Sequence, residues 1–325
     1  MGWLLTFILP IHAAIALPRA VELTSTPDKV SISIGGTHVA AYHYADESTL
    51  RPYFADLCTL GGIQVTRNHP PVEGIDRADH ADLHPGLWMA WGDLNGRDFW
   101  RNHDRVVHEA FVQEPASGQG KGSFAVRNRY ELGDGTVVCH ETCRLRFLAP
   151  CFSAPPAKLR RGGYLLLWES VFSGEKEFYF GDQEEMGLGV RVATALAANA
   201  GGRMRDSRGR INESQIWGKT ADWCDYGGII NQRQVGVTLI ADPQNFRPSW
   251  FHARDYGLLL ANAFGRQAFT GSEPSRVVVR PNEKFRLCYG IWVHESTIGA
   301  KPNLQAAYDN FAAILASEAS GPHLE

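Results

Sequence analysis

The chain has 325 residues, of which 44% are hydrophobic, 21% are charged and 11% are aromatic. These fractions are typical of a folded globular protein and exclude a disordered chain, a collagen-like repeat and a coiled coil. The formal net charge of -3 at pH 7 offers no basic surface for nucleic acid or an anionic membrane. We therefore expect neither of them as a partner.

The chain begins with a short apolar segment. Residues 1–16 end in Ala14-Ile15-Ala16, a small-x-small pattern typical of a signal peptidase site, and the segment is too short to span a bilayer comfortably. No positive charge precedes the apolar stretch, so a buried first strand is the alternative. We predict a signal peptide over residues 1–16, a secreted or periplasmic mature protein, and one β-sandwich domain over residues 17–325.

Strand patterns follow in chain order. A hairpin is predicted where residues 30–34 and 37–44 flank Gly35-Gly36, and another where residues 123–131 and 136–147 flank Gly133-Asp134-Gly135. Segments rich in β-branched and aromatic residues, bounded by Gly, Pro and Asn, predict further strands. These segments are residues 164–171, 176–180, 235–241, 256–261, 276–279 and 285–294.

Helical periodicity is clear only near the C-terminus. Asn303 can cap a helix in which Leu304, Tyr308, Phe311 and Leu315 lie on one face. A second helix, with a less regular pattern, is expected around residues 190–198. Many strands without an alternation of strand and helix indicate an all-β fold, a large antiparallel β-sandwich with a C-terminal helix.

The six cysteines show no metal-type or redox-type spacing. Cys139 and Cys143 fall in one predicted strand, about 13 Å apart, which exceeds the reach of a disulfide. Cys58, Cys151, Cys224 and Cys288 are isolated, and most of the cysteines are expected to be small buried hydrophobes. No metal and no cofactor is predicted.

The densest unusual stretch, residues 79–100, contains two His, four Asp, three Trp and three Gly. Aromatic faces beside carboxylates and amides are what a sugar site requires. The alternative is a long connection whose tryptophans plug the core and whose polar residues cap turns. His80 and His84 have the spacing of metal ligands on a helix, but Pro85 makes a helix improbable and favours an acid–base role for a histidine.

Three other clusters bring charged residues together, two of them beside aromatic residues. His252, Arg254 and Asp255 precede the apolar run at residues 258–260, where a strand end would hold them rigidly yet open to solvent. In residues 182–191, Glu184 and Glu185 are adjacent, so at most one of them is expected to face a site. A fourth cluster, residues 216–228, again sets tryptophan beside aspartate.

Several longer motifs stand out over roughly residues 27–295. They are Arg51-Pro52-Tyr53-Phe54, Val65-Thr66-Arg67, His84-Pro85-Gly86-Leu87-Trp88, Gly92-Asp93-Leu94-Asn95-Gly96, Glu185-Met186-Gly187-Leu188-Gly189-Val190-Arg191 and Arg254-Asp255-Tyr256-Gly257. These motifs resemble the bacterial PmoA-like family, labelled "methane oxygenase PmoA". The label is not expected to describe the chemistry, because a membrane methane monooxygenase subunit needs several transmembrane helices and copper ligands, whereas this chain offers one short apolar run.

The resemblance implies a domain of unknown function, often found near sugar-degrading genes, with a galactose-mutarotase-like supersandwich fold. In that fold class the site lies on the concave face of a sheet. A histidine there acts as acid at the ring oxygen, and a carboxylate acts as base at the anomeric hydroxyl. No mutarotase motif matches this chain residue by residue, so the implied mechanism rests on analogy of fold.

These observations favour a carbohydrate-active enzyme, a hydrolase, lyase or epimerase, that acts on a small-molecule or oligosaccharide ligand. The alternatives are a non-catalytic carbohydrate-binding module and a metal-dependent enzyme that uses His80, His84 and His252 with an Asp. The predicted catalytic residues are His84, His252, Glu185 and Asp255. The predicted substrate-binding residues are Arg67, His80, Trp88, Asp93, Asn95, Trp100, Arg191, Trp217, Trp223, Arg254 and Asn262.

Overall fold

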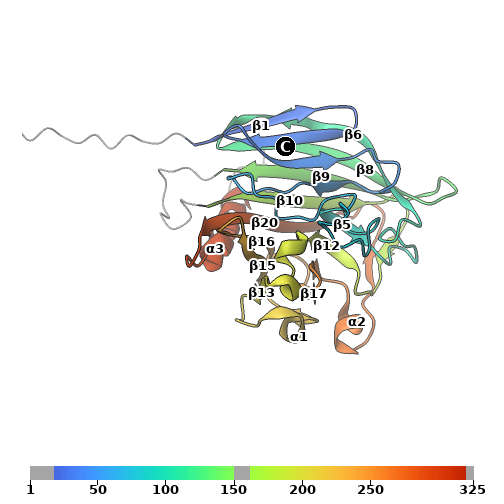
Figure 1. Ribbon diagram of the computed structural model, residues 1–325. Helices are drawn as coiled ribbons and strands as arrows, with labels where there is room; N and C mark the ends of the chain where they lie inside the picture. The colour runs from blue at the N-terminus through green and yellow to red at the C-terminus, as the bar shows by residue number, and fades with distance from the viewer. Residues whose placement is uncertain (1–17, 150–161, 320–325) are drawn as a thin grey trace, which may run out of the picture.

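The strand segments pair into two large antiparallel sheets in the computed structural model, which describes residues 18–149 and 162–319 (Figure 1). Both the signal peptide expected at residues 1–16 and Cys151 lie outside the described residues. Within the described part, no helix is long and apolar enough to cross a membrane. The predicted antiparallel β-sandwich with a C-terminal helix is confirmed.

The first sheet has ten strands. In spatial order these are β14 (Lys219–Thr220), β17 (Trp250–Arg254), β18 (Leu258–Asn262), β12 (Met186–Arg191), β5 (Leu87–Trp91), β4 (Tyr53–Ala55), β3 (Thr37–His43), β2 (Lys29–Ile34), β1 (Ala20–Ser25) and β7 (Gly118–Gln119).

The second sheet has eight strands, and β11 (Phe178–Phe180) forms a separate pair with β19 (Val277–Val279). The eight strands are β13 (Arg203–Asp206), β15 (Trp223–Ile230), β16 (Arg233–Ala241), β20 (Phe285–Thr297), β10 (Gly163–Ser173), β9 (Val137–Leu148), β8 (Lys121–Glu131) and β6 (Arg105–Ala116).

The hydrophobic core lies between the two sheets. Tyr42 on β3 contacts Phe124 on β8, with ring centroids 5.3 Å apart, and Phe54 on β4 contacts Phe147 on β9 and Trp168 on β10, both at 5.8 Å. Aromatic pairs at these separations add to the stabilisation that comes from burial alone. The inner faces of both sheets are therefore occupied, and a ligand site has to lie on an outer face.

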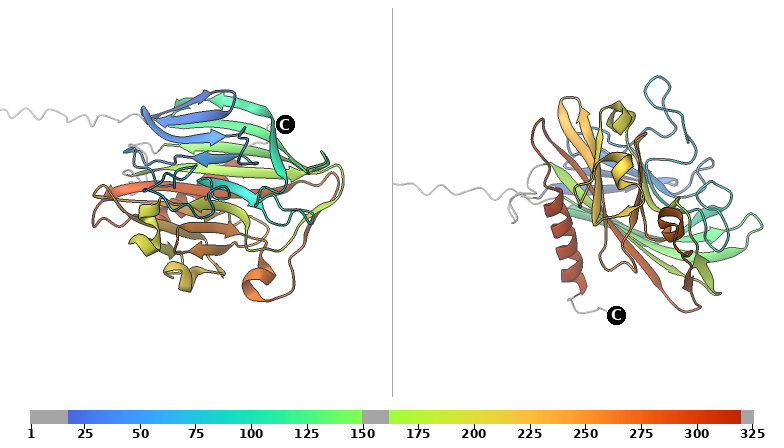
Figure 2. Two further views of the ribbon diagram at one scale, coloured as in Figure 1. Left: turned by 45° about the vertical axis from the view of Figure 1, so that its right-hand side comes forward. Right: turned by 90° about the horizontal axis from the view of Figure 1, so that it is seen from below.

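The C-terminal helix covers part of the outer face of the eight-stranded sheet. In α3 (Leu304–Ala319), Leu304, Phe311 and Leu315 pack in one cluster with Trp292 of that sheet. The helix begins as predicted, because the Asn303 side chain accepts a hydrogen bond from the N–H of Ala306 at 3.0 Å. The right-hand view of Figure 2 shows α3 on one side of the molecule and the long loops before β5 on the other.

The two predicted hairpins are confirmed as β2–β3 and β8–β9. The helix expected around residues 190–198 is wrong. Strand β12 runs to Arg191, and two short 3-10 turns, Thr194–Leu196 and Ala198–Ala200, follow it. In β12 the side chains of Leu188 and Val190 point into the core with the two-residue period of a strand. The five described cysteines are all free and buried, and Cys139 and Cys143 both lie in β9.

Candidate functional site

Four distant segments of the chain meet on the outer face of the ten-stranded sheet. Because successive side chains in a strand alternate in direction, the inward Leu188 and Val190 leave Arg191 pointing outward. The strand register then places Trp88, Gly189, Leu260 and His252 in one row across four strands, and Arg191 in the next row with Arg254. Outward residues from β5, β12, β18 and β17 therefore share one surface.

A long connection, residues 77–84, is held over this face by a buried arginine. Arg67 donates to the backbone carbonyl oxygens of Arg77 at 2.9 Å, Asp79 at 2.6 Å, His80 at 3.2 Å and His84 at 3.3 Å. Its side chain is fully buried. Arg67 was predicted to bind substrate, but the structure gives it a structural role, since its terminal nitrogens are occupied by protein carbonyls.

Beneath this connection lies a stack of rings. The ring centroids of Tyr256, His80, His84 and Trp88 follow one another at 5.7, 4.7 and 5.2 Å, with interplanar angles of 12°, 11° and 17°. Trp100 packs edge-on against Trp88 at 5.3 Å. Both tryptophans are fully buried, so they fill the outer face of the sheet and present no exposed surface for a sugar ring.

His84 is buried in the middle of the stack. Its Nδ1 lies 3.4 Å from Nη1 of Arg191, whose Nη2 donates to both carboxylate oxygens of Asp79 at 2.8 Å. Burial and the Arg191 charge hold the pKa of His84 far below its ordinary value. His84 is therefore neutral, Nδ1 is the acceptor, and the Nε2–H donor has no partner in the described structure. A buried histidine in this state is a poor acid–base catalyst.

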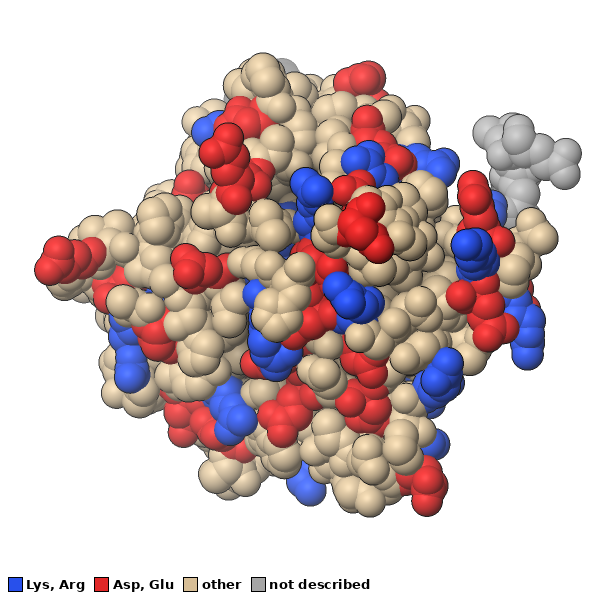
Figure 3. Space-filling view, turned by 90° about the vertical axis from the view of Figure 1, so that its right-hand side faces the viewer, with Lys and Arg blue, Asp and Glu red and all other residues tan. Residues whose placement is uncertain are grey.

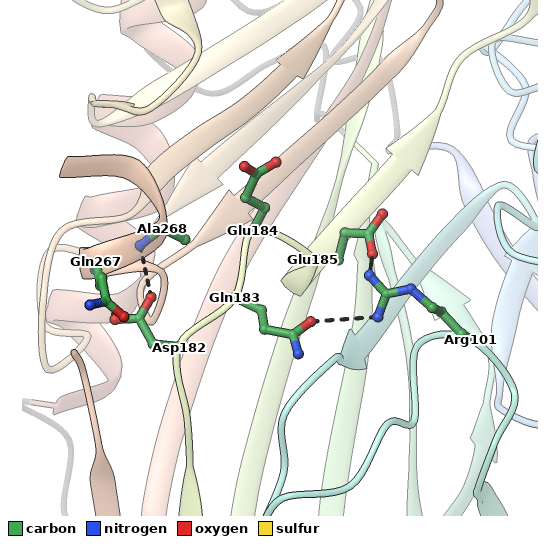
Figure 4. A pocket seen from close by; sticks show the side chains of 7 residues that line it. All are labelled: Arg101, Asp182, Gln183, Glu184, Glu185, Gln267 and Ala268. Atoms are coloured by element: carbon green, nitrogen blue, oxygen red, sulfur yellow. Dashed lines mark hydrogen bonds and ion pairs between the residues drawn. The ribbon is translucent and has the colours of Figure 1, made fainter. Parts of the chain in front are cut away.

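An open cavity of about 460 Å³ lies beside the start of β12 and the short helix α2 (Arg266–Thr270). Figure 4 shows that the neighbouring Glu184 and Glu185 side chains point in different directions, although both line the cavity. Glu185 forms an ion pair with Arg101, which also pairs with Asp98. The lining residues are Arg101, Asp182, Gln183, Glu184, Glu185, Gln267 and Ala268.

Asp182 and Glu184 have very different environments in this cavity. Asp182 accepts hydrogen bonds from the backbone N–H groups of Gln267, Ala268 and Ser275, so it caps α2. The Glu184 carboxylate has one long ion pair, 3.5 Å from Nη2 of Arg254, and lies 3.8 Å from Nδ1 of His252. Its side chain is 38% exposed. Glu184 is therefore the lining carboxylate with the most capacity left for a ligand.

His252 fixes the backbone of Glu184. Its ring Nδ1 lies 3.2 Å from the Glu184 carbonyl oxygen, and its Nε2 accepts a hydrogen bond from Nε of Arg254 at 2.9 Å. Burial and then the Arg254 charge lower the pKa of His252 to about 4. Both ring nitrogens already have protein partners, so His252 positions Glu184 and is neutral at physiological pH.

Asp255 and Glu213 join β17 to the short helix α1 (Asn212–Ile216). The N–H of Glu213 donates to Asp255 at 3.0 Å, and the N–H of Asp255 donates to Glu213 at 2.9 Å. Burial alone would raise the pKa of Glu213, but the Asp255 N–H and Arg254 offset this and hold it below its ordinary value. Asp255, predicted to be catalytic, thus makes a reciprocal structural contact.

An aromatic cluster lies beside the cavity, since Phe269 directly follows the lining residues Gln267 and Ala268 in α2. Trp217 packs against Phe269 of α2, with ring centroids 5.4 Å apart, and Arg254 lies 5.9 Å above the Trp217 ring. Phe269 also contacts His252 at 6.1 Å and Trp250 at 6.4 Å. Trp217 is thus the predicted tryptophan that lies near the cavity.

Other predicted site residues have structural positions. Asn262 is buried: its amide donates to the carbonyls of Gln183 and Glu184 and accepts from two backbone N–H groups. Asp93 and Asn95 form a turn, in which Asp93 accepts from the N–H of Gly96. Trp223 does not belong to the site, because β15 places it on the eight-stranded sheet, where it packs in the cluster beneath α3.

Sequence reasoning missed Arg101, Glu213, Tyr256 and Phe269. Arg101, Glu213 and Phe269 stand in no motif that separates them from ordinary surface residues, and Phe269 lies near the cavity only through the position of α2. Tyr256 belongs to the motif Arg254-Asp255-Tyr256-Gly257, but its ring contact with His80 depends on tertiary packing. His80, His84 and His252 do not converge. Within residues 18–149 and 162–319, no group of three or more His, Cys, Asp or Glu side chains is arranged to hold a metal ion.

Fold and site together define an antiparallel β-sandwich protein with a polar cavity on the outer face of one sheet. The chain matches the model of a family of unknown function, DUF6807, over residues 29–308, and it belongs to that family. The prediction of a domain of unknown function is thereby confirmed, whereas the PmoA-like label stays a prediction. No curated protein has a matching sequence.

Solved structures with a similar arrangement include two carbohydrate-active enzymes. A candidate kojibiose phosphorylase from the human microbiome has a TM-score of 0.34 and 8% identity, with 94% of this chain and 37% of that chain covered. A polysaccharide lyase has a TM-score of 0.30 and 10% identity, with 88% and 34% covered. This chain thus spans little more than a third of either protein.

Proposed function

We propose that the protein is a carbohydrate-active enzyme that binds a polyhydroxylated ligand in the open cavity and uses Glu184 as its acid–base residue. The observation that carries the proposal is the state of the Glu184 carboxylate, which faces the cavity with only one long ion pair, to Arg254, and one long contact with the neutral His252. Glu184 takes the place of the predicted catalytic residues His84, His252, Glu185 and Asp255, all of which have firm protein partners.

The lining suits the hydroxyl groups of a sugar. Gln183 and Gln267 supply amide donors and acceptors, Glu184 supplies a strong acceptor, and the C–H face of a sugar can pack on the aromatic border near Trp217. Such a mixture of polar groups and a ring edge fixes the orientation of a ligand and excludes water from one of its faces.

A second carboxylate stands beside the first. Glu184 contacts Nη2 of Arg254, and Glu213 accepts from Nη1 of the same guanidinium at 2.8 Å. Most enzymes that hydrolyse or transfer glycosides use a pair of carboxylates with different environments. The N–H of Asp255 and the Arg254 charge outweigh burial and hold the pKa of Glu213 below its ordinary value. Glu184, in contrast, faces the cavity with longer contacts only. We therefore favour a hydrolase or an epimerase.

A non-catalytic carbohydrate-binding module is the second candidate. It is favoured by the observation that Glu184 is the one lining carboxylate with spare capacity, since Asp182 caps α2 and Glu185 pairs with Arg101. A binding module needs the polar lining and the ring edge but no proton transfer. For both candidates we also propose that the protein is secreted or periplasmic and that neither nucleic acid nor a membrane is its partner.

The test combines a carbohydrate array with assays of sugar release and epimerisation, on the wild type and on Glu184→Gln. The matched control is Glu175→Gln, which removes the same charge from a different cavity, one that also contains Arg127 and His140. We expect Glu184→Gln to keep binding but to lower kcat by about 100-fold or more, while the control keeps both the binding and the kcat of the wild type. Binding without turnover in the wild type would establish the module, and binding of no carbohydrate would reject both candidates.

A further inference from the structure

We infer that the ligand of this cavity carries no acidic group, so that its sugars are neutral or bear an amine. The inference rests on the proposed function and narrows its substrate class. Its basis is that each guanidinium at the cavity is already paired with protein carboxylates.

Arg101, the arginine of the lining, already has protein partners. Its Nη1 donates to Asp98 at 2.7 Å, and its Nη2 pairs with Glu185. Arg254, next to the lining, donates to Glu213 and His252 and lies 3.5 Å from Glu184. A ligand carboxylate would therefore compete with protein carboxylates that already neutralise both guanidinium groups.

The predicted anion-binding arginines deeper in the face are equally committed. Arg191 pairs with Asp79, and Arg67 binds four backbone carbonyls; both side chains have almost no exposed surface. A ligand cannot reach them without removing the connection at residues 77–84. On the face seen in Figure 3, positive and negative groups alternate without a large basic area.

The fixed charges at the cavity favour the same class of ligand. The charged groups of the lining are Arg101 and the carboxylates of Asp182, Glu184 and Glu185, and Arg254 lies next to them with Glu213. The local charge is therefore negative, and an anionic sugar would place like charges close together beside Glu184. At an effective dielectric constant near 20, such a contact costs enough to weaken binding by about tenfold or more.

The inference also separates the reaction classes. Elimination from a uronic acid places negative charge on the substrate carboxylate in the transition state, and enzymes stabilise such charge with positioned cations or donors. The cavity has no uncommitted cation among the described residues. A hydrolase or an epimerase acting on uncharged or amine-bearing sugars fits this lining better than a lyase.

Matched glycans test the inference on the full-length protein. Neutral glucose, galactose and mannose oligomers are compared with their C6-oxidised uronate counterparts, and chitosan oligomers serve as the amine probe. We expect neutral or amine-bearing ligands to bind about tenfold more tightly than the uronates at low salt, and this difference to shrink in about 0.5 M salt. Glu185→Gln, which releases Arg101, should narrow the difference more than the control Glu175→Gln.

Three results would overturn the inference while the proposed function stands. The first is a uronate that binds as tightly as its neutral counterpart and competes with it. The second is a preference for neutral or amine-bearing ligands over uronates that does not change with salt, which would show that the shape of the cavity and not its charge selects the ligand. The third is uronate binding that is lost in Arg77→Ala, because Arg77 is half-exposed and contacts Asp79 at 3.8 Å outside the cavity. If no carbohydrate of any class binds, the proposed function itself fails.

Discussion

Two regions on the same sheet face contain the same kinds of residues but differ in how those residues are used. In the ring stack, His84, Arg191 and Trp88 are buried, and Arg67 binds four carbonyls of the connection above them. In the open cavity, Glu184 is exposed and has only long contacts. The comparison teaches that histidine, arginine and tryptophan can gather on a sheet face and still be used for packing. The candidate site is instead indicated by a partly exposed carboxylate with few protein partners.

The largest expected effect concerns the stack. Arg67→Ala removes the donor to four buried carbonyl oxygens, so we expect the free energy of unfolding to fall by about 3–5 kcal/mol. Urea unfolding followed by fluorescence measures this. Arg77→Ala is the control, since a half-exposed arginine should change stability by about 0.5 kcal/mol or less. A loss as small as the control's would show that the connection at residues 77–84 is held by other contacts.

The next effect is a pH dependence of stability. Because the pKa of His252 is lowered to about 4 in the folded state, the unfolded chain binds a proton more readily between about pH 6.5 and pH 4. Stability is complete above this window and falls by up to about 3 kcal/mol as the pH drops through it. Unfolding free energies at pH 7.5 and pH 4.5 measure the change. Equal losses in the wild type and in His252→Gln would contradict the prediction.

A smaller effect separates structure from catalysis at His84. His84→Gln removes one ring from the stack, and we expect stability to fall by about 1–2 kcal/mol. Turnover should stay within about twofold of wild type once the protein is folded, because the ring is buried and its lowered pKa keeps it neutral at physiological pH. A loss of turnover as large as that of Glu184→Gln would restore His84 to the catalytic role first predicted for it.

The smallest effect is expected for the stability of Glu184→Gln. A carboxylate that is 38% exposed and held by one long ion pair and one long contact contributes little, so unfolding should change by about 0.5 kcal/mol or less. Measured beside its kinetics, this variant should lose function and keep its stability, the opposite of His84→Gln. If Glu184→Gln proves strongly destabilising, the two regions are not distinct in the way proposed.

Much of the fold could be predicted because its signals are local. Alternation of apolar residues and the Gly35-Gly36 turn define the first hairpin, and Asn303 marks the start of α3. The segment at residues 190–198 was misread because Val190 and Leu196 suit a helix as well as a strand. Only the pairing of β12 with β5 and β18 decides between them, and that pairing depends on residues far apart in the sequence.

The site could be predicted in part. The sequence predicted Arg191, His252 and Arg254 beside apolar strands, and the structure brings these three residues onto one face of the ten-stranded sheet. Sequence reasoning placed Trp223 in the site wrongly, since two strands close in sequence can belong to different sheets. It also selected Glu185 over Glu184. The choice depends on Arg101, whose approach to Glu185 is a matter of tertiary packing.

Asn262 fixes the backbone of two residues that line the cavity, although it does not line the cavity itself. Its buried amide, on β18, donates to the backbone carbonyls of Gln183 and Glu184 and accepts from two backbone N–H groups, so that all its donors and acceptors are used. The position of the Glu184 carboxylate therefore depends on the Asn262 side chain, which is buried and does not line the cavity. Changes in ligand preference among related proteins can thus arise behind the cavity wall, and comparing lining residues alone would overlook them.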